Sequence, residues 1–356
     1  MAGRQRGVPE ALLAAVLFGG ATPFASRLIG DASPQVLAGL LYLGSGLVLG
    51  LSLIVLPARR QAPLTRRELP SLAGAVAFGG FLAPLLLLIG LRTTPAATAS
   101  LLLNFEVVIT AVVAWVAFHE GFNRQVGIGL GLILAGGVVA SWSAQGGLGV
   151  SAGAVAVVGA CACWAIDNNL TQQVSAKDPR QIAAVKGIVA GGANLAIGVS
   201  IGGSLPNAGP LLSAVAIGVV GYGVSLMLFV TALRSLGSAR TGAYFAVAPF
   251  VGVLVAIVVF GDQFEGRVLP AAVLMVAGVW LSITERHEHA HIHDTVEHSH
   301  VHWHDDEHAH SHPAEMPPSE PHVHAHVHDA ITHAHSHRPD IHHRHAHRPR
   351  RDPSVN

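Results

Sequence analysis

Long apolar runs, separated by short polar or glycine-containing turns, occupy the first 284 residues of the chain. A helix needs roughly 20 mostly apolar residues to cross the ~30 Å hydrocarbon core of a bilayer. The runs of about this length predict ten membrane-spanning helices, at residues 9–29, 35–56, 70–91, 96–118, 125–142, 150–173, 181–203, 209–233, 240–260 and 267–284. The pattern therefore predicts an all-α membrane protein.

The fourth and fifth predicted helices recur without a gap as the ninth and tenth. Residues 91–141 align with residues 233–283, and Leu91-Arg92 falls on Leu233-Arg234. A long apolar chain that repeats itself is typical of a transporter built from two halves. We therefore predict two five-helix repeats, at residues 8–142 and 149–284, followed by a tail at residues 285–356.

Basic residues are unevenly distributed among the predicted loops, and positively charged loops stay in the cytoplasm. With the N-terminus inside, the outer loops hold only Arg27, Arg92 and Arg267, whereas the inner loops hold Arg59, Arg60, Arg66, Arg67, Arg124, Lys177, Arg180, Arg234 and Arg240. We expect a multi-pass protein of the inner cell membrane with both termini cytoplasmic. Because each half has an odd number of spans, the second half is inverted relative to the first, which places Glu120 inside and its counterpart Asp262 outside.

Composition separates this membrane body from a polar tail. The chain of 356 residues is 51% hydrophobic and only 12% charged, and all but one of its 23 histidines follow Arg286. The body contains no arrangement of nucleophile and base and no phosphate-binding loop, so we expect no enzymatic activity and no cofactor requirement. Nothing in the chain suggests a nucleic-acid partner. Glycines four residues apart, at Gly46/Gly50 and Gly187/Gly191 among others, predict close helix packing in lipid.

Several short motifs carry a resemblance to a known family. Each half begins with an aromatic residue beside small ones, the fourth helix of each half ends near an acid, and the fifth carries glycine: Phe18-Gly19, Cys163-Trp164-Ala165, Phe118-His119-Glu120, Phe260-Gly261-Asp262, Gly131 to Val139 and Ala272 to Leu281. With the duplication, these residues make the chain resemble EamA-domain transporters of the drug/metabolite transporter (DMT) superfamily over residues 8–284. The resemblance implies a ten-helix secondary carrier whose central cavity is lined by the first, third and fourth helices of each half. It implies no particular substrate.

Glu106 is the clearest candidate for transport chemistry, since it lies about halfway along the fourth span beside Asn104. Ionisable groups in lipid are costly and tend to face a cavity or a partner. Desolvation favours the neutral form of a carboxyl group, which suits Glu106 to bind and release a proton. The alternative is a protonated glutamate that only packs against a neighbouring helix.

Asp167 and Lys186 are each about six residues from the hairpin that joins the sixth and seventh spans, so they reach similar depth on adjacent helices. An ion pair between them is geometrically natural. It can be a fixed salt bridge or part of a gate or substrate site. Asn168 and Asn169 favour the functional interpretation, because consecutive amides in a span need a ligand, water or another helix as partner.

The tail after Arg286 alternates histidine with other residues, and its low hydrophobicity predicts disorder. Alternate imidazoles suit Zn, Ni or Co. The candidate metal ligands are His287, His289, His291, His293, His298, His300, His302, His304, His308, His310, His312, His322, His324, His326, His328, His333, His335 and His337. A solvated extension without metal is the alternative.

The sequence as a whole predicts a secondary-active transporter of small polar metabolites or drug-like solutes, most simply a proton-coupled exporter. Its partners would be the lipid bilayer, a small solute, protons and, at the tail, divalent metal ions. One alternative is a divalent-metal exporter that the histidine-rich tail feeds with Ni, Co or Zn. Another is a metal store or sensor tethered to the membrane.

Overall fold

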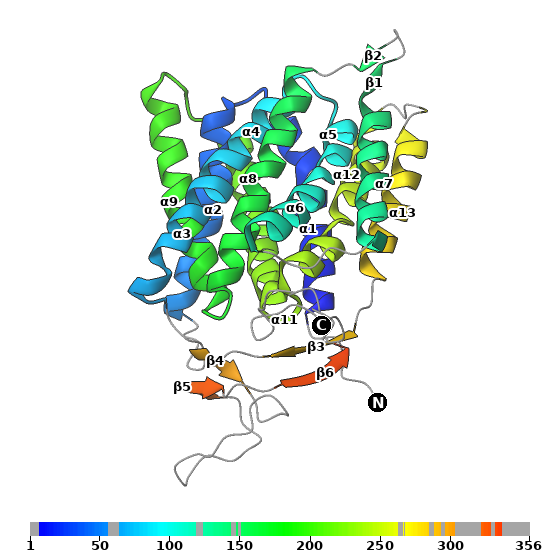
Figure 1. Ribbon diagram of the computed structural model, residues 1–356. Coiled ribbons are helices and arrows are strands. Elements are labelled where there is room, and N and C mark those ends of the chain that lie inside the picture. Colours follow the sequence, from blue (N-terminus) through cyan, green and yellow to red (C-terminus); the bar gives the residue numbers. More distant parts are fainter. Residues whose placement is uncertain are drawn as a thin grey trace.

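The structure, a computed structural model, describes residues 7–55, 64–118, 124–143, 147–148, 151–262, 266, 268–284, 288–292, 296–302, 322–328 and 332–336. Figure 1 shows the helices side by side in one bundle, with α1 beginning and α13 ending at the same end of it. An even number of crossings produces this arrangement.

The first half contains five spans. They are formed by α1 (Val8–Arg27), α2 (Pro34–Val55), the third span made of η1 (Arg66–Glu68), α3 (Leu69–Ala75), η2 (Val76–Leu82) and α4 (Ala83–Leu91), the fourth made of α5 (Ala96–Leu102) and α6 (Phe105–Phe118), and α7 (Arg124–Ser141). A short antiparallel pair, β1 (Trp142–Ser143) and β2 (Gly147–Leu148), connects this half to the next.

The second half repeats the plan with α8 (Ala152–Val174), α9 (Pro179–Ser200), α10 (Ala208–Ile217), η3 (Gly218–Val224), α11 (Ser225–Phe245), α12 (Ala248–Val258) and α13 (Val268–Ile283). Gly237, with φ 73°, is a non-helical kink inside α11 that divides the eighth span from the ninth. Among the described residues, eight helical segments are long and apolar enough to cross a membrane, and the shorter apolar helices Gly127–Val139 and Val268–Leu281 fill the fifth and tenth positions. The ten predicted spans are confirmed.

The irregular segments of the two halves correspond. The third and eighth spans each contain a seven-residue π-helical segment, η2 and η3, and these begin 142 residues apart, which is the offset of the sequence repeat. The fourth helix of each half is also broken, at Leu103-Asn104 and at Ala246-Val247. Because π-helical turns and helix breaks release backbone groups, they are common at functional sites.

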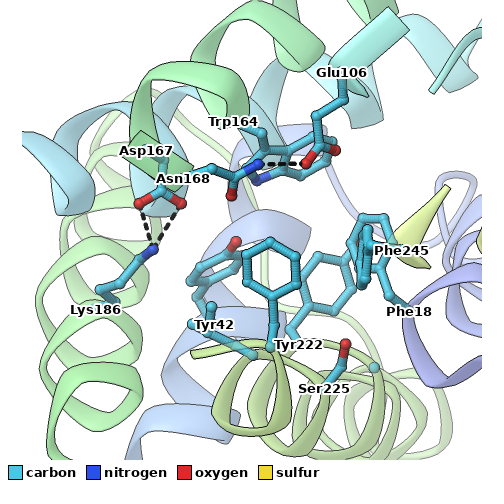
Figure 2. Close-up of a pocket in the computed structure, with 13 residues that line it drawn as sticks. Phe18, Tyr42, Glu106, Trp164, Asp167, Asn168, Lys186, Tyr222, Ser225 and Phe245 are labelled. Carbon is cyan, nitrogen blue, oxygen red and sulfur yellow. Dashed lines mark hydrogen bonds and ion pairs between the residues drawn. The ribbon is translucent and has the colours of Figure 1, made fainter. Parts of the chain in front are cut away.

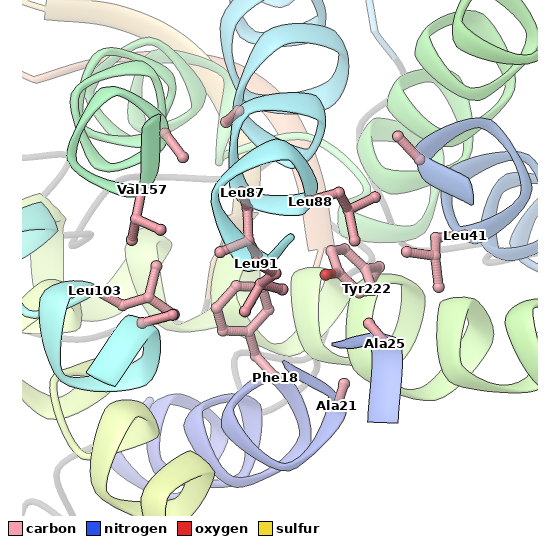
Figure 3. Close-up of a cluster of buried hydrophobic side chains, with 14 of the residues drawn as sticks. Phe18, Ala21, Ala25, Leu41, Leu87, Leu88, Leu91, Leu103, Val157 and Tyr222 are labelled. Carbon is pink, nitrogen blue, oxygen red and sulfur yellow. The ribbon is translucent and has the colours of Figure 1, made fainter. Parts of the chain in front are cut away.

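Contacts between the halves follow an approximate two-fold axis. Helix α2 packs on α9 and α7 on α13, so equivalent helices meet each other, and α5 of the fourth span packs on α12 of the ninth, while α1 contacts α11 as α8 contacts α4. The α2–α9 contact depends on the predicted glycines, since a Cβ built on Gly187 would lie 2.6 Å from the Cα of Gly46. Figure 3 shows the apolar core where both halves contribute, with Phe18, Leu88, Val157 and Tyr222 among its members.

The histidine-rich tail contains four described strands, β3 (Glu288–Ile292), β4 (Val296–His302), β5 (His322–His328) and β6 (Thr332–Ser336). They form two separate antiparallel pairs, β3 with β6 and β4 with β5, whose register sets histidine opposite histidine, as at His291 and His333. Two-stranded ladders are marginally stable in water. This agrees with the expectation of a tail that has no packed core.

Candidate functional site

A small cavity lies between the two halves, where the irregular segments meet. Its walls come from α1, α2, α6, α8, α9, η3 and α11, and its volume is about 50 Å³. A water molecule needs roughly 10–15 Å³ measured in this way, so the space holds a few waters. Figure 2 shows Glu106, Asn168 and Asp167 with the Trp164 ring on one side of the cavity. The aromatic rings of Tyr42, Tyr222, Phe18 and Phe245 lie across from them.

Glu106 reaches this cavity because the fourth span breaks just before it. The break uses tight backbone bonds, from Asn104 N to Leu101 O and from Glu106 N to Leu103 O, and α6 then restarts with Glu106 in its first turn. A helix N-terminus favours a carboxylate. The side chain is buried, at 8% exposure, and its Oε1 accepts a hydrogen bond of 2.7 Å from the Asn168 amide. No ion pair joins it to a basic side chain within the described part of the chain.

The ion pair predicted between Asp167 and Lys186 is present. Lys186 Nζ lies 2.6 and 2.7 Å from the two carboxylate oxygens, and the lysine is 1% exposed. Thr171, one turn along α8, donates its hydroxyl to Asp167 Oδ1 at 2.8 Å. Burial of two charges is tolerated when they are paired and their remaining lone pairs are hydrogen-bonded, and this arrangement meets both conditions.

The π-helical segment η2 supports this polar wall. Its Gly79 carbonyl accepts hydrogen bonds from the Tyr42 hydroxyl at 2.9 Å and from Trp164 Nε1 at 3.2 Å. A side chain on Gly79 would overlap the Asp167 carboxylate. The lack of a side chain at Gly79 therefore makes room for Asp167, while its carbonyl positions two of the aromatic residues.

The six candidate residues of the spans do not all meet. Glu106, Asp167, Asn168 and Lys186 line the cavity, whereas Asn104 and Asn169 are buried outside its lining. Asn104 donates to Leu101 O and lies 3.4 Å from the Met275 sulfur on α13, and Asn169 donates to Ala165 O in its own helix. These two amides contact their own helix or a neighbouring one instead of the cavity.

Sequence reasoning overlooked most of the aromatic lining. Tyr42, Tyr222, Phe229 and Phe245 lie on three separate elements, α2, η3 and α11, and no local motif connects them. Phe18 and Trp164 belong to the aromatic motifs that begin each half. Their ring centroids are 5.4 Å apart, and their ring planes meet at 88°. The internal repeat could have pointed to part of this lining, because it makes the cavity elements η3 and α11 the counterparts of η2 and α4.

Two arginines near span ends make specific contacts, and the first is Arg234. It donates from Nε to Ser175 O at 2.9 Å and from Nη2 to Lys177 O at 2.6 Å. These carbonyls follow the C-terminal end of α8, where a cation is favoured. Lys177 also pairs with Glu68 at 3.3 Å. These bonds tie α8, α11 and η1 together at one end of the bundle.

At the C-terminal end of α1 the bundle is more open. A hollow of about 540 Å³ is lined by threonines, by Arg92 and by the ion pair of Arg27 with Asp262, whose atoms Nη2 and Oδ1 are 2.6 Å apart. Arg27 also lies over the Phe260 ring, 4.7 Å from its centroid. Arg92, the repeat counterpart of Arg234, is exposed here. Glu120, the counterpart of Asp262, lies outside the described residues.

The tail histidines are only partly described. His287, His293, His304, His308, His310, His312 and His337 lie outside the described residues, and the rest of the predicted ligands belong to the strands, for which only the backbone is described. Among the residues whose side chains are described, no group of three His, Cys, Asp or Glu could hold a metal ion. Metal binding by the tail stays a prediction.

Ten spans in two inverted halves around a polar cavity define a multi-pass membrane transporter. The EamA-like transporter family matches residues 5–142 and again residues 151–284. The chain therefore belongs to the EamA-like transporter family, once in each half.

Two individual proteins are also similar. An uncharacterised transporter from Methanothermobacter thermautotrophicus (strain Delta H) is 29% identical over 208 residues, which span 56% of this chain and 60% of the relative's length. A solved crystal structure of another protein is similar to this chain with a TM-score of 0.61 and 19% sequence identity. The match covers 76% of this chain and 94% of that protein's chain. At this identity the structural likeness supports the fold alone.

Proposed function

We propose that this protein is a proton-coupled secondary carrier of the inner membrane that exports small polar metabolites or drug-like solutes. The observation that carries the proposal is Glu106, a buried carboxyl group in the cavity between the halves whose hydrogen-bond partner is the neutral amide of Asn168. A carboxyl group without a fixed cation can exchange its proton as the cavity opens to either side. Both termini would be cytoplasmic, as the distribution of basic loops predicts.

The difference between the two ends of the bundle supports transport by alternating access. Arg234 is engaged with the α8 carbonyls, while its counterpart Arg92 is exposed beside a wide hollow. In an inverted repeat, the opposite conformation exchanges the environments of equivalent residues. Arg92 would then bind the carbonyls that end α1, and Arg234 would be released. The conformation with Arg234 engaged is closed on the proposed cytoplasmic side.

Arg234→Gln is expected to open the cytoplasmic side, because the shorter neutral amide cannot reproduce both charge-assisted bonds. A single cysteine at Ser225, in the cavity wall, reports this change in a background where Cys161 and Cys163 are alanine. In inside-out vesicles, an impermeant maleimide should label it several-fold faster in the Arg234→Gln variant than in the parent.

Arg92→Gln is the matched control, since it removes the equivalent arginine from the open end. It should leave cytoplasmic labelling of the Ser225 cysteine at the parental rate or lower it. Equal acceleration by both substitutions would mean that the arginines only stabilise the fold and do not select between two conformations.

The metal-exporter and metal-store alternatives depend on the tail, so truncation after Arg286 separates them from a solute carrier. Solute export should survive the truncation, because the cavity residues all lie in the body. The full-length protein should bind several Zn or Ni ions at pH 7.5, and binding should weaken at pH 5.5, since protons compete for imidazole below about pH 6.5. Calorimetric titration of full-length and truncated protein at both pH values tests this. Equal binding by the two proteins would show that the tail does not hold the metal.

A further inference from the structure

Aromatic rings form most of the apolar surface of the central cavity. Phe18 is at their centre, with its ring centroid 5.4 Å from Trp164, 5.6 Å from Tyr222 and 5.5 Å from Phe245. Tyr42 extends the cluster, 5.4 Å from Tyr222. The faces of aromatic rings carry partial negative charge and attract organic cations. Rings from both halves contribute, so the site is shared between the parts that would move during transport.

The charged groups of the lining leave one negative charge in excess when Glu106 is ionised. The lining contains two carboxyl groups and one lysine, and both oxygens of Asp167 are already within 2.7 Å of Lys186. From the described side chains, Glu106 receives only the amide hydrogen bond of Asn168. An anion would therefore find no free positive charge in this lining, whereas one positive charge, from either a proton or a cationic solute, would neutralise it.

Tyr222 adds an unused polar atom. Tyr222 is buried at 4% exposure, and its hydroxyl has no hydrogen-bond partner among the described residues. Buried polar atoms are nearly always satisfied, so an unpaired hydroxyl in a cavity wall is suited to a ligand. The hydroxyl oxygen can accept a hydrogen bond from an N–H group of the solute.

From these three observations we infer that the solute class is organic monocations with an apolar, preferably aromatic, body, and that the cation and a proton occupy Glu106 alternately. This inference rests on the proposed carrier function and names its substrate class. Because the closed cavity has only about 50 Å³, the cation enters when the halves separate. The closed conformation holds the proton. Binding of the cation then releases one proton, so the charge in the cavity stays balanced.

The test measures binding of radiolabelled phenyltrimethylammonium to the purified full-length protein at pH 8. Competitors are benzylammonium, the uncharged isostere tert-butylbenzene and the anion benzoate. The two cations should compete at least tenfold more strongly than either of the others. Equal competition by tert-butylbenzene, stronger competition by benzoate, or no binding of phenyltrimethylammonium would overturn the inference.

Two substitutions connect the binding to the named residues. Phe18→Leu keeps an apolar side chain but removes the ring face, and should weaken phenyltrimethylammonium binding about 3- to 30-fold. Phe24→Leu is its control, since Phe24 packs on Phe260 and lies outside the cavity lining. Tyr222→Phe removes only the unpaired hydroxyl, so it should weaken benzylammonium, which has N–H groups, and spare phenyltrimethylammonium. Parental affinity for both cations in Phe18→Leu and Tyr222→Phe would contradict the assignment to this cavity.

A transport screen separates failure of this inference from failure of the carrier function. If the protein moves a neutral or anionic solute in response to a pH gradient and no organic cation competes, the substrate class is wrong and the carrier function stands. If no solute responds to the gradient, the proposed function itself fails.

Discussion

Glu106→Gln is expected to abolish transport driven by a pH gradient while leaving the protein folded. Glutamine keeps the shape of a protonated glutamate, and its side-chain oxygen can accept the same hydrogen bond from Asn168. It carries no exchangeable charge, so a proton gradient has nothing in the cavity to act on. In liposomes with an imposed pH gradient, solute accumulation by the variant should fall to the level of protein-free liposomes, with elution profile and thermal stability unchanged.

Exchange of labelled for unlabelled solute without a gradient separates coupling from substrate binding. A neutral solute should still exchange in Glu106→Gln, whereas an organic monocation should not, because the carboxylate also balances its charge. Asp31→Asn is the control, since Asp31 is an exposed acid outside the cavity lining. It should accumulate solute as the parent does. A Glu106→Gln variant that still responds to the gradient would remove Glu106 from the coupling mechanism.

The spans could be predicted from the sequence because the bilayer imposes a length on every helix. The gapless internal repeat predicted the two halves. The glycines spaced four residues apart predicted that α2 and α9 approach each other closely. The sequence did not reveal the break at Leu103-Asn104. No proline lies there, so the break follows from tertiary packing. In the second half, Pro249 lies two residues after the equivalent break, in the first turn of α12.

The candidate site was predictable only where a residue is costly in lipid. Glu106, Asp167 and Lys186 are conspicuous because a buried charge needs a partner or a cavity. In helices that are apolar all round, hydrophobic periodicity cannot distinguish cavity from lipid, so it does not identify Tyr42, Tyr222 or the phenylalanines. The same ambiguity explains why Asn104, two residues before Glu106, was wrongly expected to line the site. The turn at the helix break places it against Met275 instead of in the cavity.

The ion pair of Asp167 with Lys186 gives the second large effect, on stability. Loss of one partner leaves the other charge buried and unpaired, at a cost of roughly 3 to 5 kcal/mol, whereas replacing both with neutral groups costs less. Lys186 is 1% exposed, and Thr171 and both carboxylate oxygens are arranged around it, so loss of one partner leaves the other charge buried. Asp167→Asn and Lys186→Met should each lower the yield and the melting temperature of the purified protein strongly.

The double variant Asp167→Asn with Lys186→Met should recover much of the loss, because it leaves no charge to neutralise. The measurement is a double-mutant cycle on thermal stability in one detergent, with Asp262→Asn as a control that breaks the partly exposed pair with Arg27. That control should cost about 1 kcal/mol or less, because exposed ion pairs contribute little. Strictly additive losses in the cycle would show that Asp167 and Lys186 are not coupled. A stable double variant can then be assayed for transport: export at the parental rate would make the pair a structural salt bridge, and loss of export would place it in the transport cycle beside Glu106.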